Sequence, residues 1–404
     1  FSTTHTFPPF PMSCEMSRRR RRRPSSPAAA PPLEDENLLS EILLRLPPDP
    51  SSVVSKRWRR LISDPGFSRR FRLHHHRNPP LIGSFSHLYF ASSMEAPNRV
   101  PDGHFCLQVD EDEVNDNFIC LGCRHGLVLI FHVRRLQVLV WDPVTSELHR
   151  IATPPGFDAK KVPISGAVLR AAGDIQHFQV VLVTTETDDQ QHTRAMAQVY
   201  SSETGEWGDI FSTMLPPKAS RHELPTMIAI ESPAVLVGHS LYWLLTDSRA
   251  GILKFDLDRQ SLSVIHVPVN IYANGNWQFA VMPAEGGGLG GLFLSKFTAQ
   301  LWKWKAGSDG VASWVLGKTI ELDKLLSISS KKRGPPMVVG FAEDNNVVFL
   351  WTEMDVFTIQ LQSLQFKNLG ETNFLSRYHP LESVYAAGMG IGGGRGGAEL
   401  LPNT

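Results

Sequence analysis

A repeated eleven-residue pattern places the strongest constraint on the fold of this chain. The aligned windows are residues 138–148, 197–207, 252–262 and 356–366. Each window has an apolar or aromatic residue at its fourth place and another apolar residue seven positions later. These pairs are Trp141 and Leu148, Tyr200 and Trp207, Phe255 and Leu262, and Ile359 and Phe366. Turn-forming residues separate the members of the first three pairs, so the pattern predicts a series of related β-hairpins.

The spacing of the hairpins predicts a repeat architecture. Trp141 and Tyr200 are 59 residues apart, Tyr200 and Phe255 are 55 apart, and a further hairpin at 299–316 fills the longer interval after them. Short apolar runs precede the hairpins, and we expect them to be inner strands buried on both faces. These runs are residues 126–131, 178–183, 240–245, 291–297 and 346–351. A unit of three or four strands every 50-odd residues is typical of a propeller blade.

The repeat therefore predicts an all-β, propeller-like domain over residues 81–386, with about six blades of a kelch-like kind. The segment Glu382–Ala386 is the candidate for a terminal strand that closes the ring by pairing with the first blade. The acidic stretch Asp110–Glu113 with Asp116 is predicted to be a solvated insertion.

The segment 33–77 has a different, helical pattern. Leu38, Leu39, Ile42, Leu43 and Leu46 form one apolar stripe, and Pro47-Pro48 ends it. A second helix carries Trp58, and a third begins after Asp64-Pro65. About 40 residues of small helices cannot bury this apolar surface alone, so a partner is expected.

This segment resembles an F-box, in the version found at the N-terminus of plant F-box proteins that have a β-rich C-terminal half. The resemblance rests on L-x-D-x-x-L-L-x-E-I-L-L-R-L-P-P from Leu33 to Pro48 and on K-R-W-R-R-L-I-S-D-P-G-F from Lys56 to Phe67. It implies binding to a Skp adaptor and, through it, to a cullin in a ubiquitin ligase. The positions implied to pack on the adaptor, or to support that surface, are Leu33, Leu38, Leu39, Ile42, Leu43, Leu46, Pro47 and Trp58.

The link Asp49–Ser55 is about five residues shorter than the family pattern, and Glu34 stands where many F-boxes carry proline. At 100° per residue, a loss of about five residues rotates the second helix by roughly 140° relative to the first. Two interpretations therefore stay open: a ligase subunit whose propeller selects a target protein, and a propeller scaffold whose F-box no longer binds the adaptor.

The composition excludes several classes of function. Forty basic and forty acidic residues give a net charge of zero, which argues against a nucleic-acid binder. No run approaches 18 apolar residues, so no membrane span is expected. Four cysteines indicate a reducing setting, in the cytoplasm, the nucleus or both, and Arg18–Arg23 is either a nuclear-import signal or a solvated tail. We expect disorder in residues 1–32 and in the glycine-rich tail 387–404.

The sequence offers few candidates for catalysis. Cys120 and Cys123 with His104 and Cys106 form a loose zinc pattern, and packing cysteines are the favoured interpretation. The paired acids Asp188-Asp189 and Glu343-Asp344 are interpreted as soluble loop residues. We therefore expect no catalytic residue, metal or cofactor, and a propeller hydrolase is the weakest alternative.

Exposed aromatic residues in blade loops are candidates for target recognition, because aromatic anchors dominate protein interfaces. The candidates are Tyr272, Trp277 and Trp314. The alternative, that the tryptophans wedge between blades, is favoured.

Overall fold

The computed structural model describes residues 35–45, 56–62, 64–75, 79–96, 99–113, 116–157, 163–170, 176–188, 192–216, 226–229, 232–246, 251–267, 277–306, 312–328, 334–371 and 375–383. The chain divides into two compact units, residues 1–45 and residues 46–404. The predicted disordered segments 1–32 and 387–404 and the short link Asp49–Ser55 lie outside the described residues.

Three short helices occupy the segment with the helical pattern. They are α1 (Glu36–Arg45), α2 (Lys56–Ile62) and α3 (Pro65–His75). The Asp35 carboxylate caps α1 by accepting a hydrogen bond from the Asn37 amide at 2.8 Å. Asp64 caps α3 in the same way through the Phe67 amide, also at 2.8 Å. Capping by an aspartate therefore fixes where both helices begin.

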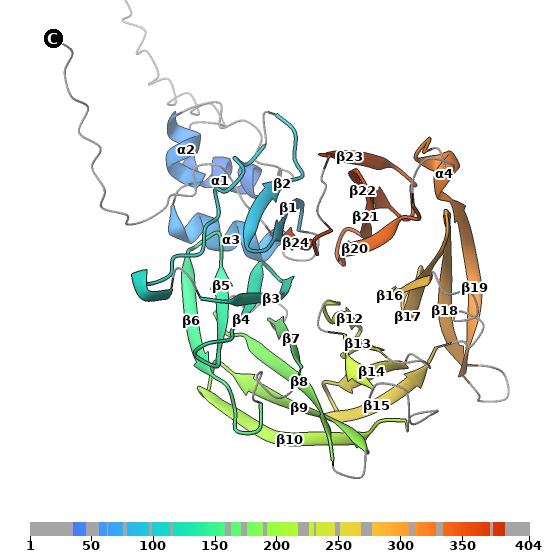
Figure 1. Cartoon of the computed structure of the whole chain (residues 1–404). Coiled ribbons are helices and arrows are strands. Elements are labelled where there is room, and N and C mark those ends of the chain that lie inside the picture. The colour runs from blue at the N-terminus through green and yellow to red at the C-terminus, as the bar shows by residue number, and fades with distance from the viewer. Residues whose placement is uncertain are drawn as a thin grey trace, which may run out of the picture. The chain divides into compact units, whose positions relative to one another are not determined.

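The rest of the described chain is mainly β-strand. These strands form six sheets, and each sheet is one blade of a propeller (Figure 1). Blade 1 contains β1 (Leu81–Ser86), β2 (Tyr89–Ser92) and the last strand, β24 (His379–Glu382). Blade 2 contains β3 (Phe118–Arg124), β4 (Leu127–His132), β5 (Gln137–Asp142) and β6 (Glu147–Ala152). Blade 3 contains β7 (Ile164–Leu169), β8 (Gln179–Thr187), β9 (Thr193–Ser201) and β10 (Glu206–Met214).

The other three blades follow in chain order. Blade 4 contains β11 (Met227–Ile228), β12 (Val235–Val237), β13 (Ser240–Thr246), β14 (Gly251–Asp256) and β15 (Ser261–His266). Blade 5 contains β16 (Trp277–Pro283), β17 (Leu289–Ser295), β18 (Thr298–Ala306) and β19 (Ala312–Glu321). Blade 6 contains β20 (Met337–Ala342), β21 (Val347–Thr352), β22 (Asp355–Gln360) and β23 (Phe366–Glu371). A 3₁₀ turn (Glu111–Glu113) and a short helix, α4 (Leu322–Leu325), lie between blades.

The innermost strands of neighbouring blades contact one another around the centre of the ring. Contacts join β3 to β7, β12 to β16, β16 to β20, β20 to β24 and β24 to β3. The core lies between the sheets: Val181 and Val183 of blade 3 share one buried cluster with Trp243 and Phe255 of blade 4. The predicted count of six blades is confirmed.

The register of the hairpins explains the repeated sequence pattern. The two apolar residues of each window are directly opposite partners in an antiparallel pair: Trp141 and Leu148, Tyr200 and Trp207, Phe255 and Leu262, and Ile359 and Phe366. Facing side chains of this kind stabilise a pair of strands. The two apolar residues of each window are therefore seven positions apart because the chain makes a tight hairpin turn between them.

The apolar runs were predicted to be inner strands buried on both faces, and the structure shows them largely buried. The runs form β4, β8, β13, β17 and β21, which are the second strands of their sheets. All six residues of β4 are buried, because one face (Leu129) packs into the cluster shared with blade 3 and the other (Val128) into the cluster shared with blade 1.

The last strand closes the ring. In β24, Glu382 pairs with Leu81 of β1 and His379 pairs with Phe85. Closure by a C-terminal strand is confirmed, but the strand spans His379–Glu382 and shares only Glu382 with the predicted segment. Residues 384–386 lie outside the described part of the chain. Blade 1 thus joins the two ends of the propeller.

Two tryptophans connect outer strands of neighbouring blades. The Trp207 indole on β10 donates a hydrogen bond to the carbonyl of Ala152, the last residue of β6, at 2.9 Å. The Trp314 indole on β19 does the same to His266, the last residue of β15, also at 2.9 Å. Trp314 also packs edge-on against Phe279. Trp314 therefore bridges blades 4 and 5, in agreement with the interpretation that the tryptophans wedge between blades.

The closing strand gives a test of the fold. Leu381 on β24 is fully buried, so Leu381→Ala should cost about 2 to 5 kcal/mol in unfolding free energy. Leu375→Ala is the matched control, because Leu375 is 52% exposed and should change stability by less than about 0.5 kcal/mol. Urea denaturation followed by circular dichroism measures both. Equal effects of the two substitutions would contradict the closing role of β24.

Candidate functional sites: the central cavity and the helical segment

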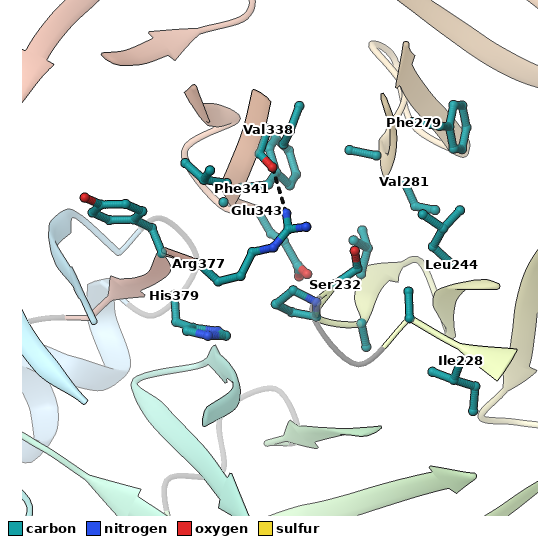
Figure 2. Close-up of a pocket in the computed structure, with 18 of the residues that line it drawn as sticks. Ile228, Ser232, Leu244, Phe279, Val281, Val338, Phe341, Glu343, Arg377 and His379 are labelled. Atoms are coloured by element: carbon teal, nitrogen blue, oxygen red, sulfur yellow. Dashed lines mark hydrogen bonds between the residues drawn. The ribbon is translucent and has the colours of Figure 1, made fainter. Parts of the chain in front are cut away.

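A cavity of about 520 Å³ lies at the centre of the ring (Figure 2). Its walls come from, or directly adjoin, the inner strands of all six blades. The wall is mainly apolar, with Ile228, Leu244, Phe279, Val281, Val338 and Phe341 among the lining residues. Cavities of this size and character are typical of sites for small ligands or for side chains of a partner.

A break in the inner strand of blade 4 shapes the cavity. The strands β11 and β12 both pair with β13, Met227 facing Thr246 and Val235 facing Tyr242. After β11, the Ala229 amide still donates a hydrogen bond to the Leu244 carbonyl at 2.9 Å, and Ser232 and Pro233, just before β12, belong to no strand. Proline has no amide hydrogen and cannot continue a ladder of hydrogen bonds. Leu244 and Leu245 of β13, the second strand, also line the cavity.

The two ends of the cavity differ in chemistry. At one end, Arg377 stands just before β24 and donates a hydrogen bond to the carbonyl of Val338, near the start of β20, at 2.7 Å. At the other end lie Cys123, near the end of β3, and Glu343, just after β20. Because the inner strands run in the same direction in each blade, starts and ends of these strands mark opposite ends of the channel. We call them the Arg377 end and the Glu343 end.

An ion pair joins three blades across the Glu343 end. The Arg124 guanidinium of blade 2 contacts the Glu343 carboxylate of blade 6, with Nε to Oε2 at 3.0 Å. The same guanidinium donates to the Ala234 carbonyl at 2.6 Å, and Glu343 accepts from the Leu236 amide at 3.3 Å. The Arg124 side chain is 8% exposed and that of Glu343 is 19% exposed. Burial acts to lower the pKa of Arg124, but the charge and hydrogen bond of Glu343, together with the charges of Asp344 and Glu382, outweigh it and the pKa is raised.

Two further carboxyl groups lie beside this pair. Burial, together with the charge of Asp344, raises the pKa of Glu382 to about 7, although Asn345 donates two hydrogen bonds to it at 2.8 Å. Partial burial, together with the charge of Glu343, raises the pKa of Asp344 to about 6, although the residue as a whole is exposed. The prediction that Glu343 is a soluble loop residue is wrong, because Arg124 draws its carboxylate into the channel.

The two cysteines of β3 lie near His379 of the closing strand. The ladder between β3 and β4 shifts register between Cys120 and Gly122, so one extra residue is accommodated there. Burial acts to raise the pKa of the Cys120 thiol, but hydrogen bonds from Cys123 and His379 lower it. Burial and the neighbouring Cys120 raise the pKa of Cys123. Across the described ranges, no group of three or more histidine, cysteine or acidic residues has an arrangement suited to a metal ion.

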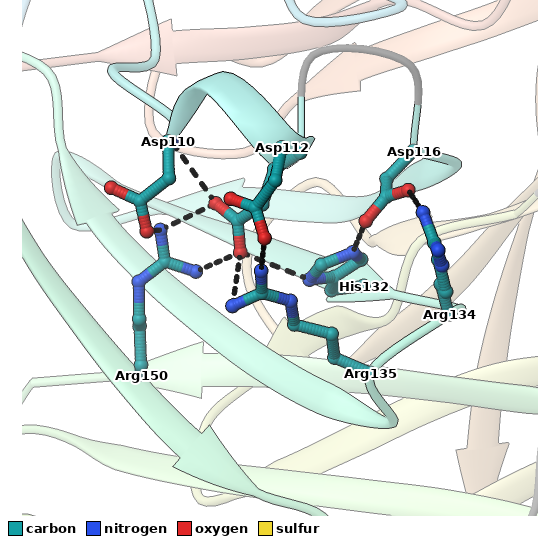
Figure 3. A network of polar contacts seen from close by, with 8 residues as sticks. Asp110, Asp112, Asp116, His132, Arg134, Arg135 and Arg150 are labelled. Atoms are coloured by element: carbon teal, nitrogen blue, oxygen red, sulfur yellow. Dashed lines mark hydrogen bonds and ion pairs between the residues drawn. The ribbon is translucent and has the colours of Figure 1, made fainter.

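The acidic stretch before blade 2 is largely an ion-pair network (Figure 3). Glu113 is fully buried and accepts hydrogen bonds from Arg150 at 2.9 and 2.8 Å. Asp116 contacts the His132 ring and Arg134, both at 2.8 Å. The predicted solvated insertion is therefore wrong for Glu113 and Asp116. Their basic partners come from β4, the turn after it and β6, so the interaction was not visible from local sequence.

The predicted adaptor-binding residues divide by exposure. Leu38 is 42% exposed, whereas Leu39 is fully buried and Leu43 is 3% exposed. Ile42 and Trp58 are half-buried. Leu33, Leu46 and Pro47 lie outside the described residues. The role of these residues in adaptor binding stays a prediction.

Among the other candidates for target recognition, only Trp314 has a described side chain. Tyr272 lies outside the described residues, and Trp277 begins β16 but its side chain is not described. Trp314 lies on an outer strand. No feature of the sequence singled out the cavity residues Arg377 and Leu244, because a channel forms only when all blades are in place.

These features define the class of the chain: a six-bladed β-propeller with an apolar central cavity and a helical segment before it. The family model described as "F-box protein At3g26010-like, beta-propeller" matches residues 102–380, more than half of the chain. The chain therefore belongs to this family of F-box protein β-propellers.

A curated relative and two solved structures are also similar. A putative F-box protein of Arabidopsis thaliana, At3g16210, is 24% identical over 242 residues, which cover 58% of this chain and 60% of that protein. The chain thus spans less than two thirds of that relative's length. The WD40 domain of SCAP from fission yeast has a TM-score of 0.30 at 8% identity, covering 67% of this chain and 57% of that one. AztD from Citrobacter koseri, in its apo form, has a TM-score of 0.29 at 9% identity, and the match covers 65% of this chain and 74% of that chain. No helix in the described part of the chain is both long and apolar enough to cross a bilayer.

The raised pKa of Glu382 predicts a pH dependence of stability. A carboxyl group that ordinarily titrates near 4.5 and titrates near 7 in the fold favours the folded state at low pH, and this contribution is lost as the pH rises through 7. Glu382→Gln removes this titration. The unfolding free energy of Glu382→Gln relative to wild type should therefore increase by about 2 to 3 kcal/mol between pH 4 and pH 8. Urea titrations at each pH measure the difference, and Asp209→Asn, at an exposed position, should show none.

The ion-pair network predicts the opposite pH trend for Glu113. Hydrogen bonds from Arg150 outweigh burial and lower the pKa of Glu113, so its contribution to stability is present above its ordinary pKa and lost as the pH falls. Glu113→Gln should lower the melting temperature at pH 7 by about 3 °C or more, and by less near pH 4. Glu111→Gln, at the exposed neighbouring position, serves as control. If the ion-pair network did not stabilise the fold, the two variants would have equal melting temperatures.

Proposed function

We propose that this chain is a substrate-recognition subunit of an SCF-type ubiquitin ligase. The F-box segment would bind a Skp adaptor and, through it, a cullin, while the propeller would bind the target protein. The observation that supports this most directly is the family match over residues 102–380, together with the F-box-like motif from Leu33 to Phe67. The ubiquitin transfer itself would belong to other subunits, so the chain is proposed to be no enzyme and to need no cofactor.

The exposure of α1 supports the adaptor half of the proposal. An exposed leucine beside a half-exposed isoleucine on one short helix presents apolar surface that a partner can cover. Leu38 and Ile42 are four positions apart and so lie on one helical face. Leu39 and Leu43 are buried within the chain itself and are better suited to support this surface than to contact a partner.

The alternative is a propeller scaffold whose F-box no longer binds the adaptor. The observation that favours it is the link Asp49–Ser55, which is about five residues shorter than the family pattern. In either case we propose a protein target, no nucleic acid and no membrane as partner, and a location in the cytoplasm, the nucleus or both.

A pull-down with a plant Skp adaptor separates the two proposals. The full chain should bind, and Leu38→Asp/Ile42→Asp should abolish binding, because two charges in an apolar interface cost several kcal/mol. Asn37→Asp adds a charge at an exposed position of the same helix, where the motif specifies no residue type, and should leave binding intact. Failure of the wild-type chain to bind would favour the scaffold. Circular dichroism of each variant verifies that the chain is folded.

A further inference from the structure

Two thiols lie on the same face of β3, the innermost strand of blade 2. Residues three positions apart in a regular strand point to opposite faces of the sheet, because side chains alternate. The register shift between Cys120 and Gly122 changes this arrangement. Cys120 pairs with Ile130 of β4, and Cys123 pairs with the residue two positions before Ile130. Both cysteines consequently pack against one buried cluster, the one that blades 1 and 2 share.

The two thiols are close enough to be joined by a disulfide. The bulged segment from Cys120 to Cys123 runs beside two positions of β4, which span about 6.4 to 6.8 Å between Cα atoms. Disulfides occur at Cα separations of up to about 6.8 Å. The Cys120 and Cys123 side chains also form a hydrogen bond with each other. A bond between the two sulfur atoms therefore needs little movement of the backbone.

The surroundings of the two thiols differ. Burial acts to raise the pKa of the Cys120 thiol, but the hydrogen bond from Cys123 and the charge and hydrogen bond of His379 hold it well below its ordinary value. Burial and the neighbouring Cys120 raise the pKa of the Cys123 thiol; the charge of Arg124 opposes this shift and that of Glu382 adds to it. One cysteine is therefore suited to react as a thiolate, while the other stays a thiol beside it.

The position of the pair is suited to reaction with a small oxidant. Cys120 and Cys123 are both half-buried. Cys123 lines the central cavity, and so does His379, which Figure 2 shows on the cavity wall. A partly exposed cysteine that is held as a thiolate, with a second cysteine next to it, is typical of sites that peroxides oxidise.

We propose that Cys120 and Cys123 are a reversible oxidation site, at which a peroxide converts the two thiols into a disulfide. His379 is a positioning residue that stabilises the Cys120 thiolate. In a reducing setting such a bond is transient rather than structural.

The reaction has two steps. The Cys120 thiolate attacks one oxygen of hydrogen peroxide, the O–O bond breaks, hydroxide leaves, and Cys120 becomes a sulfenic acid. The Cys123 sulfur then attacks the Cys120 sulfur, and the hydroxyl group leaves with the Cys123 proton as water. The two thiols lose two electrons and two protons in total, and the peroxide is reduced to two waters. A dithiol reductant reverses the bond by thiol–disulfide exchange.

The first experiment detects the bond directly. One tryptic peptide, residues 100–124, contains Cys106 as well as the pair, so Cys106→Ser, at an exposed position, is the background for all variants. The full chain is exposed briefly to hydrogen peroxide, its free thiols are blocked with iodoacetamide, and the digest is analysed by mass spectrometry. The peptide should lose two hydrogen atoms and carry no alkyl group. Dithiothreitol before blocking should restore two alkylated thiols.

Two other results would overturn the proposal. One is a peptide that still carries two alkyl groups after peroxide treatment. The other is a bond from either cysteine to Cys14 or to a second chain.

The second experiment assigns the roles of the two cysteines. Cys123→Ser keeps a hydrogen-bond donor but cannot form the bond, so the sulfenic acid of Cys120 should accumulate and be trapped by dimedone on denaturation. In Cys120→Ser, the remaining Cys123 should react with peroxide about ten times more slowly, because it stays protonated. Equal rates in the two variants would contradict the assigned roles.

The third experiment tests His379. His379→Gln should slow the oxidation of Cys120 about tenfold and shift the pH profile of its alkylation to higher pH, because the thiolate loses a stabilising partner. His239→Gln, which removes an exposed histidine paired with Asp258, is the control and should react like the background chain. An unchanged rate and pH profile in a folded His379→Gln variant, verified by circular dichroism, would contradict the role of His379. None of these reactions needs the adaptor or a target, so their failure would leave the proposed function untouched.

Discussion

The pairing of β24 with β1 is the interaction on which the rest of the molecule depends. A propeller is a ring of sheets that contact only their neighbours, so an unclosed ring would leave two end blades with an uncovered face. Here the last four strand residues, His379–Glu382, complete the blade begun by Leu81–Ser86, almost 300 residues earlier along the chain. The channel, the contacts of Arg377 beside β24 and the burial of Glu382 all follow from this one closure.

A second constraint acts across the channel rather than around it. Arg124, Ala234 and Glu343 belong to blades 2, 4 and 6, and they meet at one end of the channel. Removing two charges from water is costly unless each is paired and hydrogen-bonded, and the contacts with Ala234 and Leu236 provide those additional bonds. Alternate blades are thereby linked directly, in addition to their contacts with neighbours.

The sequence predicted the repeating part of the fold and little of its centre. The paired residues such as Trp141 and Leu148 are local in sequence, because a hairpin brings them together within seven residues. The number of blades and the closing strand follow from such local signals by counting. Innermost strands such as β11 were missed, and the bounds of β24 were predicted incorrectly, because these segments are short and lack an alternating pattern. The ion pairs of Glu113 and Glu343 were missed because their partners are 37 and 219 residues away.

The interruption of the inner strand in blade 4 breaks the symmetry of the ring. Six similar blades give nearly equivalent directions around the propeller axis, and a bound molecule would have no reason to prefer one of them. In blade 4 the innermost strand is divided into β11 and β12, whereas the described innermost strands of the other blades are single segments. The wall of the channel therefore lacks sixfold symmetry, and a molecule in the channel would meet a different surface in the blade 4 sector than elsewhere.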